Sequence, residues 1–145
     1  MIAKNSTTAN KIIAQFKDQS VQKEYLALVE GIINKDSFNL YDSISKTLTP
    51  SGGRKISDDG KEANTEIRIL KRFQKNNQTL LSVIPHSGRT NQIRIHLANI
   101  GHPIVGDKGY KDPAYFKNNP LTYEDDRLFL HAWKISFSHK NKKLS

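Results

Sequence analysis

The stretch from His86 to Tyr110, HSGRTNQIRIHLANIGHPIVGDKGY, carries the clearest pattern in the chain. Ile93, Leu97 and Ile100 follow one another at the i, i+4, i+7 spacing of a helix with one buried side. A glycine comes directly after Ile100 and a proline two residues further on, and both are typical helix stop signals. We therefore predict a helix over residues 90–100.

Arg94 lies beside the apolar side of this predicted helix, between Leu97 and Ala98 on a helical wheel. A guanidinium keeps its charge, so its burial requires a carboxylate, a phosphate or several carbonyl groups nearby. In the alternative interpretation, the head of the side chain reaches water while its stem packs on the protein. The spacing alone leaves both interpretations open.

Arg89 comes just before the same helix, after the dipeptide Ser87-Gly88. The free N–H groups and the positive dipole end of a helix N-terminus attract phosphate, and an arginine there adds to the attraction. This arrangement suits an RNA backbone. The alternative is an ordinary capped turn with an exposed arginine.

Outside this stretch, the spacing of apolar residues predicts one more helix and four strands. The helix is amphipathic, covers residues 6–17 and is capped by Ser6 or Thr7. The last strand is apolar on both faces, which indicates a central, buried position in the sheet. The first three strands alternate with period two, and the second and third form a hairpin. The four strands cover residues 21–29, 63–73, 79–85 and 127–137.

The remaining segments predict loops. Residues 32–60 hold only short alternating pieces and a long loop, and residues 111–126 are polar and rich in turn residues. Strands outnumber helices and are partly joined by hairpins, which predicts the α+β fold class, with a mixed or largely antiparallel sheet and helices packed on it. At 145 residues with 36% hydrophobic content, the chain has a normal size for one domain.

The charge balance favours a polyanionic partner. Lysine and arginine total 23 against 14 aspartates and glutamates, a net charge of +9, so nucleic acid is the leading partner class. No apolar run approaches the ~20 residues of a spanning helix, and we expect no membrane insertion. The absence of cysteine fits a reducing cytoplasm. Because His96, His102 and His131 follow no recognised ligand spacing, no metal site is predicted.

Four blocks of sequence, in this order, resemble the RluA-like family of RNA pseudouridine synthases. The long signature HSGRTNQIRIHLANIGHPIVGDKGY is the most specific of them, and Asn91 is its one departure, since the family usually has histidine there. The other blocks are KEYLALVEG (23–31), GKEANTE (60–66) and LFLHAWKISFSH (128–139). The resemblance covers nearly the whole chain and implies the pseudouridine synthase catalytic fold.

The resemblance also implies roles for single residues. Tyr25 matches the tyrosine that packs against the flipped uracil and assists proton removal at C5, although alternation alone favours a core aromatic. Arg94 matches the arginine that forms a salt bridge with the catalytic aspartate. Leu130 matches an apolar residue of the uracil pocket, with plain sheet core as the alternative. Arg89 and Gln92 are the other substrate-binding candidates.

The activity that the resemblance implies is isomerisation of uridine to pseudouridine in ribosomal or transfer RNA. Family members break the N1 glycosidic bond, turn the bound base and rejoin it through C5, with an aspartate nucleophile and no cofactor. The target base must first leave its stack. We expect a cytoplasmic location and a monomer, although the sequence carries no signal of oligomeric state.

The family's nucleophile lies in an HRLDxxTSG-type segment that is not in this sequence, and none of the aspartates present matches it. Residues 1–145 are therefore expected to be a partial catalytic domain, without the N-terminal catalytic segment and the C-terminal end. We predict that this chain alone is inactive, and that the missing partner of Arg94 lowers its stability. The alternative is a non-catalytic basic RNA-binding module, which binds without turnover.

Overall fold

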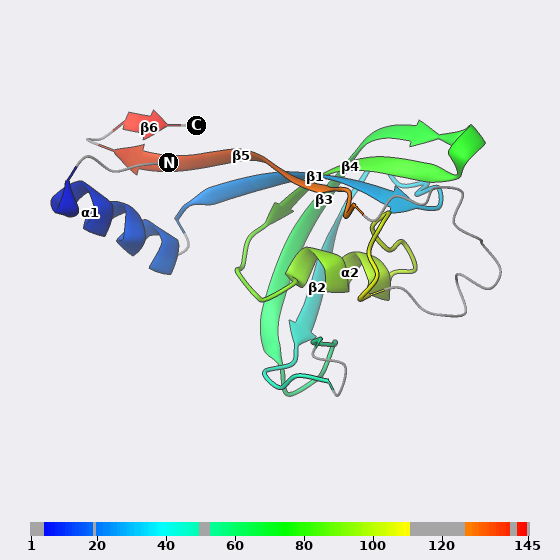
Figure 1. The fold of residues 1–145 in the computed structure, drawn as a ribbon, viewed down its shortest axis with the longest axis horizontal. Helices are drawn as coiled ribbons and strands as arrows, with labels where there is room; N and C mark the ends of the chain where they lie inside the picture. The colour runs from blue at the N-terminus through cyan, green and yellow to red at the C-terminus, as the bar shows by residue number, and fades with distance from the viewer. Residues whose placement is uncertain (1–4, 19, 50–52, 111–126, 140–141, 145) are drawn as a thin grey trace.

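The computed structural model describes residues 5–18, 20–49, 53–110, 127–139 and 142–144. The strands form one six-stranded sheet in the order β2-β3-β4-β1-β5-β6, and every neighbouring pair is antiparallel (Figure 1). This confirms the predicted α+β class. The elements are α1 (Ser6–Lys17), β1 (Gln22–Glu30), β2 (Ser37–Ile44), β3 (Lys61–Phe73), the 3-10 helix η1 (Gln74–Asn76), β4 (Gln78–Pro85), α2 (Gln92–Asn99), β5 (Leu130–His139) and β6 (Lys142–Leu144).

Helix α2 packs across β2, β3 and β4 and covers one face of the sheet (Figure 1). The apolar side of α2 supplies Ile93 and Leu97 to the main core, as its spacing predicted. The strands supply to the same core the buried side chains of Ala27, Val29, Leu40, Ile67, Leu81 and Val83. Removing this apolar surface from water is the main force that holds α2 on the sheet.

Helix α1 lies away from α2, beside β5, and only Ile12 of its residues is buried (Figure 1). Its range is the predicted one, but the cap is different: Asn5 Oδ1 accepts a hydrogen bond of 2.9 Å from the Thr8 N–H. Gln15 ties the helix to β5, because its amide exchanges hydrogen bonds of 2.7 and 2.8 Å with the Ser138 backbone.

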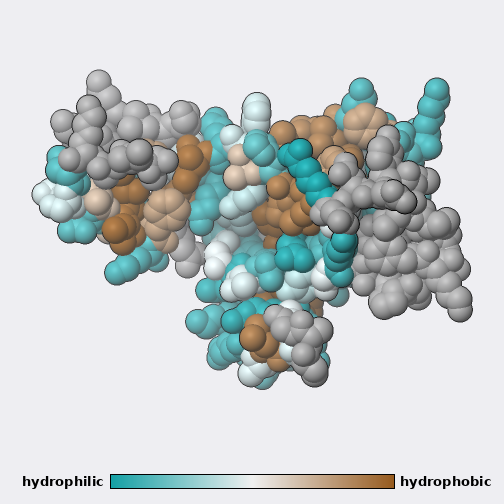
Figure 2. Space-filling view, in the orientation of Figure 1, coloured by the Kyte–Doolittle hydropathy of each residue, from teal (hydrophilic) through white to brown (hydrophobic). Residues whose placement is uncertain are grey.

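The prediction that residues 127–137 form a central, buried strand was wrong. Trp133 is 61% exposed and Ile135 is 38% exposed, and Figure 2 shows apolar surface over α1 and the adjoining part of the sheet. Within the described residues, β1 is the one strand that pairs with β5 over Leu130–Ser136, and β6 joins only from Phe137 onward. The strand therefore lies near the margin of the sheet, and its first residue, Leu130, packs against the core to which α2 contributes.

Residues 32–60 hold more structure than the sequence predicted. Strand β2 pairs with β3 along its whole length, from Ser37 opposite Arg68 to Ile44 opposite Lys61. The predicted polar segment at 111–126 lies outside the described residues. Neither α1 nor α2, the α-helices in the described part of the chain, has the length and apolar character needed to cross a membrane.

Candidate functional site

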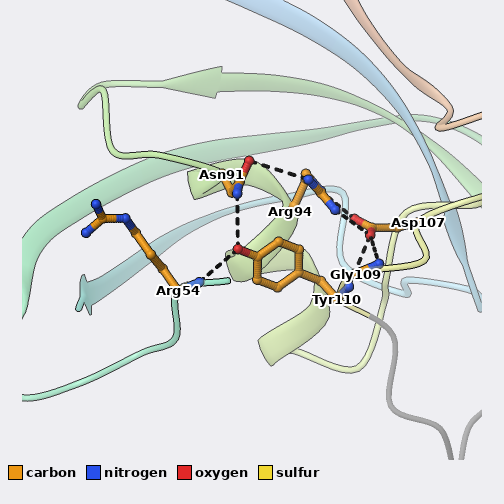
Figure 3. A network of polar contacts seen from close by, with 6 residues as sticks. All are labelled: Arg54, Asn91, Arg94, Asp107, Gly109 and Tyr110. Atoms are coloured by element: carbon orange, nitrogen blue, oxygen red, sulfur yellow. Dashed lines mark hydrogen bonds and ion pairs between the residues drawn. The ribbon is translucent and has the colours of Figure 1, made fainter. Parts of the chain in front are cut away.

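Arg94 and Asp107 form a bidentate ion pair at the side of α2 (Figure 3). Arg94 Nε and Nη2 each donate to one carboxylate oxygen of Asp107, both at 2.8 Å. The backbone N–H groups of Gly109 and Tyr110 donate to the same carboxylate, at 2.9 and 3.1 Å. The Asp107 side chain is 1% exposed and that of Arg94 25%, so this is a largely desolvated pair in which both carboxylate oxygens accept hydrogen bonds.

The pair also determines the protonation states. Burial alone would raise the pKa of Asp107, but the hydrogen bonds from Arg94 and from the Gly109 N–H outweigh it, so this pKa is lowered. The hydrogen bond to Asp107 raises the pKa of Arg94. Asp107 is therefore a carboxylate and Arg94 a guanidinium cation at neutral pH.

The expectation that Arg94 has no partner in this chain was wrong, because the chain itself supplies Asp107. Sequence reasoning missed it, since the search for a partner was directed at the family's nucleophile. The available signal was the Gly106-Asp107-Lys108-Gly109 turn in the same signature. Gly106 has φ +76°, and a Cβ there would lie 1.9 Å from the Arg127 carbonyl oxygen, so only glycine allows this path of the chain.

The aromatic ring of Tyr110 also contacts the Arg94 guanidinium. The guanidinium carbon of Arg94 lies 4.6 Å from the centre of the Tyr110 ring. The Tyr110 hydroxyl accepts hydrogen bonds from the Arg54 backbone N–H at 3.0 Å and from the Asn91 amide at 3.1 Å. Tyr110 therefore connects the segment that follows β2 to the start of α2, as Figure 3 shows.

Asn91 suits its position before α2 both in its backbone conformation and in its side-chain hydrogen bonds. Its φ of 57° lies in the left-handed region, which asparagine tolerates better than most residues. Its amide nitrogen donates to Tyr110, and its amide oxygen accepts from Arg94 Nη1 at 3.4 Å. The departure from the family's usual histidine thus leaves a residue that contacts both Arg94 and Tyr110.

Part of the Arg94 guanidinium remains available. A guanidinium has five N–H groups, and three of those of Arg94 donate, two to Asp107 and one to Asn91. Two N–H groups, one each on Nη1 and Nη2, have no acceptor among the described residues. The geometry therefore presents a fixed cation that can bind a second carboxylate.

Tyr25 and Leu130 lie close together on the face of the sheet that α2 covers. Tyr25 is opposite Val83 on one side and Ala132 on the other, and Leu130 is opposite Ala27. Both side chains are half-buried and pack against the main core, to which α2 also contributes. Since the side-chain hydrogen bonds of Arg94 go to Asp107 and Asn91, Tyr25 and Arg94 border the same core without a direct bond.

Gln92 is 4% exposed, and its amide is fully engaged within the protein. Its oxygen accepts from the Ser87 hydroxyl and from the Arg89 N–H, and its nitrogen donates to the Asn64 carbonyl and to the Thr65 hydroxyl. Gln92 thus holds the turn before α2 against β3. A contact between Gln92 and substrate would have to replace one of these four hydrogen bonds.

Arg89 is half-buried at this turn. Its Nε–H donates to the Glu62 carbonyl at 3.0 Å. This bond anchors the Arg89 side chain to the start of β3, and the two Nη groups of Arg89 have no hydrogen-bond acceptor among the described residues.

The three histidines singled out in the sequence have different surroundings. His96 is completely buried on α2, and neither ring nitrogen has a hydrogen-bond partner among the described residues. Burial lowers the pKa of His96, and the charge of Asp42 opposes this only in part. The His102 ring lies 2.8 Å from the Glu30 carbonyl oxygen, and His131 is exposed. The described residues hold no group of three or more acidic or histidine side chains placed to bind a metal.

The fold, with its positioned arginine beside an apolar face, is that of a pseudouridylate synthase domain. The structure of human RNA Pseudouridylate Synthase Domain Containing 1 superposes with a TM-score of 0.81 at 25% sequence identity, covering 98% of this chain and 60% of that one. The resemblance inferred from the sequence blocks is thereby supported by the three-dimensional arrangement.

Sequence comparison leads to the same class. The family model for RNA pseudouridylate synthase matches residues 1–99. An uncharacterized RNA pseudouridine synthase of Aquifex aeolicus is 37% identical over 144 residues, and the Ribosomal large subunit pseudouridine synthase C of Haemophilus influenzae is 38% identical over 142 residues. The alignments cover 98% and 96% of this chain but only 45% and 43% of those relatives. The chain belongs to the RNA pseudouridylate synthase family and spans less than half the length of these two relatives.

Proposed function

We propose that this chain supplies part of the active site of an RNA pseudouridine synthase. The observation that carries the proposal is the state of Arg94: Asp107 fixes its guanidinium, yet two of its N–H groups remain available for a second carboxylate. An arginine held in this way can bind and orient a nucleophilic aspartate. The nucleophile would come from an HRLDxxTSG-type segment.

In the proposed reaction, Arg94 keeps the aspartate ionised by lowering its pKa, and the carboxylate attacks C1′ of the ribose. The bond between C1′ and N1 breaks as the bond between C1′ and the carboxylate forms. The base then turns, C5 bonds to C1′, and the carboxylate leaves. Tyr25 packs against the uracil ring and assists removal of the C5 proton, and N1 gains a proton, so that the product is an isomer of the substrate. Leu130 lines the apolar side of the pocket.

The substrate class is RNA. The charge of +9 favours a polyanion, and the name of the Haemophilus influenzae relative specifies the large ribosomal subunit, so a ribosomal RNA is the first substrate to test, with transfer RNA as the second. We further propose that the protein acts without a cofactor, as a monomer and in the cytoplasm. Residues 1–145 would be a partial catalytic domain, inactive without the nucleophile.

The test uses a form extended upstream to include the HRLDxxTSG-type segment, with RNA that carries tritium at C5 of uridine. Arg94→Lys keeps the charge but cannot satisfy Asp107 and a second carboxylate in the same geometry. We expect tritium release to fall at least ~100-fold, the effect of removing one strong transition-state interaction, with RNA affinity unchanged. Activity within about twofold of the unaltered form would contradict the role of Arg94.

The second candidate is a non-catalytic RNA-binding module, which the strongly basic composition favours. It predicts that the extended form binds RNA but never forms pseudouridine. Pseudouridine formation by the extended form would exclude it.

A further inference from the structure

Two grooves meet at the turn that precedes α2. The first has a volume of about 360 Å³ and runs between the end of α1, the start of β1 and the end of β4; among its lining residues are Phe16, Lys17, Lys23, His86, Gly88 and Arg89. The second has a volume of about 350 Å³, and its lining includes Lys46, Arg54, Lys61, Gly88, Arg89 and Thr90. Gly88 and Arg89 belong to both, so the two grooves adjoin at this point.

Both grooves are cationic. None of the described residues that line them is an aspartate or a glutamate. The neighbouring third groove, of about 640 Å³, has both Asp42 and Glu62 in its wall. The absence of acidic side chains therefore distinguishes the first two grooves from the third. A polyanion that follows the first two grooves would lie beside positive charge along its path. The carboxylates of the third groove would repel it from there.

The turn at the junction is held by hydrogen bonds and is open at Gly88. The hydrogen bonds of Gln92 to Ser87 and Arg89 hold it in place, so a ligand would meet a preformed surface. A Cβ at Gly88 would have no neighbouring atom within 4 Å, so the backbone there is open to close approach. The two Nη groups of Arg89 can donate to phosphate oxygens without breaking the bond from its Nε to Glu62.

The first groove also offers an aromatic surface. The Phe16 ring is part of its wall, is 40% exposed and lies 5.4 Å from Lys23 Nζ. An exposed aromatic ring beside a lysine is the combination with which proteins bind single-stranded nucleic acid, the ring stacking on a base and the cation contacting phosphate. Bases inside a duplex are stacked on one another and are not free to stack on Phe16.

We propose that a single strand of RNA passes from the first groove over Gly88 and Arg89 into the second, with its phosphates on Lys17 and Lys23 on one side and on Lys46 and Lys61 on the other. This rests on the proposed function for the identity of the polyanion. The path runs beside the candidate site, because the backbone of Arg54, a second-groove residue, donates to the Tyr110 hydroxyl that also contacts Asn91.

The test is a titration of the 145-residue chain with a short fluorescent single-stranded RNA at several salt concentrations. Two double variants each remove two charges from one groove: Lys17→Gln with Lys23→Gln, and Lys46→Gln with Lys61→Gln. The matched control, Lys71→Gln with Lys75→Gln, removes two charges from the hairpin formed by β3 and β4, away from both grooves. Circular dichroism and thermal melting establish that each variant is folded.

Each groove variant should bind the single-stranded RNA roughly tenfold more weakly. The slope of log K against log salt should also be less steep by about 1.4, because each variant loses two phosphate contacts and each contact contributes ~0.7 for a single strand. The control should keep the original affinity within about twofold. The same RNA annealed to its complement should bind less tightly than the single strand.

Equal weakening by the control and groove variants, no RNA binding at all, or equal affinity for the duplex would each overturn the proposal. The outcome is separable from that of the proposed function. If the groove variants weaken RNA binding while the extended form makes no pseudouridine, the RNA path is supported and the proposed function is contradicted. If the extended form makes pseudouridine but the groove variants bind RNA normally, the proposed function is supported and the RNA path is contradicted.

Discussion

At the scale of single residues, Asp107 determines the state of the candidate site. Its buried carboxylate accepts from Arg94 and from two backbone N–H groups. Asp107→Asn keeps the size of the side chain but leaves the Arg94 cation without its counter-charge, so the free energy of unfolding should fall by about 3 kcal/mol. Urea denaturation measures the loss. Asp58→Asn, in an exposed loop, is the control and should change it by less than about 0.5 kcal/mol.

The same carboxylate should contribute to the acid sensitivity of the fold. Because the pKa of Asp107 is lowered in the folded protein, its stabilising effect is complete above the unfolded pKa of about 3.9 and is lost as the pH falls through the folded value. The difference in unfolding free energy between the unaltered protein and Asp107→Asn should therefore shrink as the pH is lowered below about 4. A difference that stays constant down to acid unfolding would show that Asp107 is not ionised in the fold.

At the scale of elements, α2 carries an unexpected weakness in His96. Its imidazole is buried without a hydrogen-bond partner among the described residues, and burial lowers its pKa. The fold therefore favours the neutral form. Its contribution to stability is complete above the unfolded pKa of about 6.5 and is lost as the pH falls from there through the lowered pKa of the folded state. Protonation at lower pH should weaken the packing of α2 on the sheet.

His96→Leu tests this directly, since leucine fills a similar space without polar atoms. We expect the variant to be as stable as the unaltered protein at pH 8 or up to ~2 kcal/mol more stable, and to lose less stability between about pH 6.5 and 5. His131→Leu makes the same change at an exposed position and should leave the pH profile unaltered. Destabilisation at pH 8 by more than about 1 kcal/mol would mean that the imidazole is hydrogen-bonded in solution.

The elements also separate what the sequence could predict from what it could not. Helices α1 and α2 and the β3–β4 hairpin were predicted near their observed positions, because short-range periodicity and turn residues specify them. The exposure of β5 was not predicted. Its run of apolar residues is the same whether long-range pairing places the strand in the centre of the sheet or near the margin. The partner of Arg94 was missed although the glycine-flanked turn at Asp107 was visible, because the spacing shows a turn there but not which side chain the turn brings to Arg94.

At the scale of the whole molecule, the features of the chain complement one another. One face of the sheet is covered by α2 and holds Tyr25 and Leu130, the flank of α2 holds the fixed guanidinium of Arg94, and the two cationic grooves pass the start of the same helix. Among the described residues, Asp107 is the one carboxylate bonded to Arg94, and both of its oxygens are occupied. The proposed function takes its nucleophile from an HRLDxxTSG-type segment, which these 145 residues do not contain.

The most direct measurement of this claim is pseudouridine formation on unmodified ribosomal and transfer RNA by the 145-residue chain, assayed beside the form extended to include the HRLDxxTSG-type segment. We predict that only the extended form is active, and that replacing the aspartate of that segment by asparagine abolishes its activity. Turnover by the 145-residue chain alone would mean that another acid is the nucleophile and would contradict the account, as would inactivity of both forms on RNA that they bind.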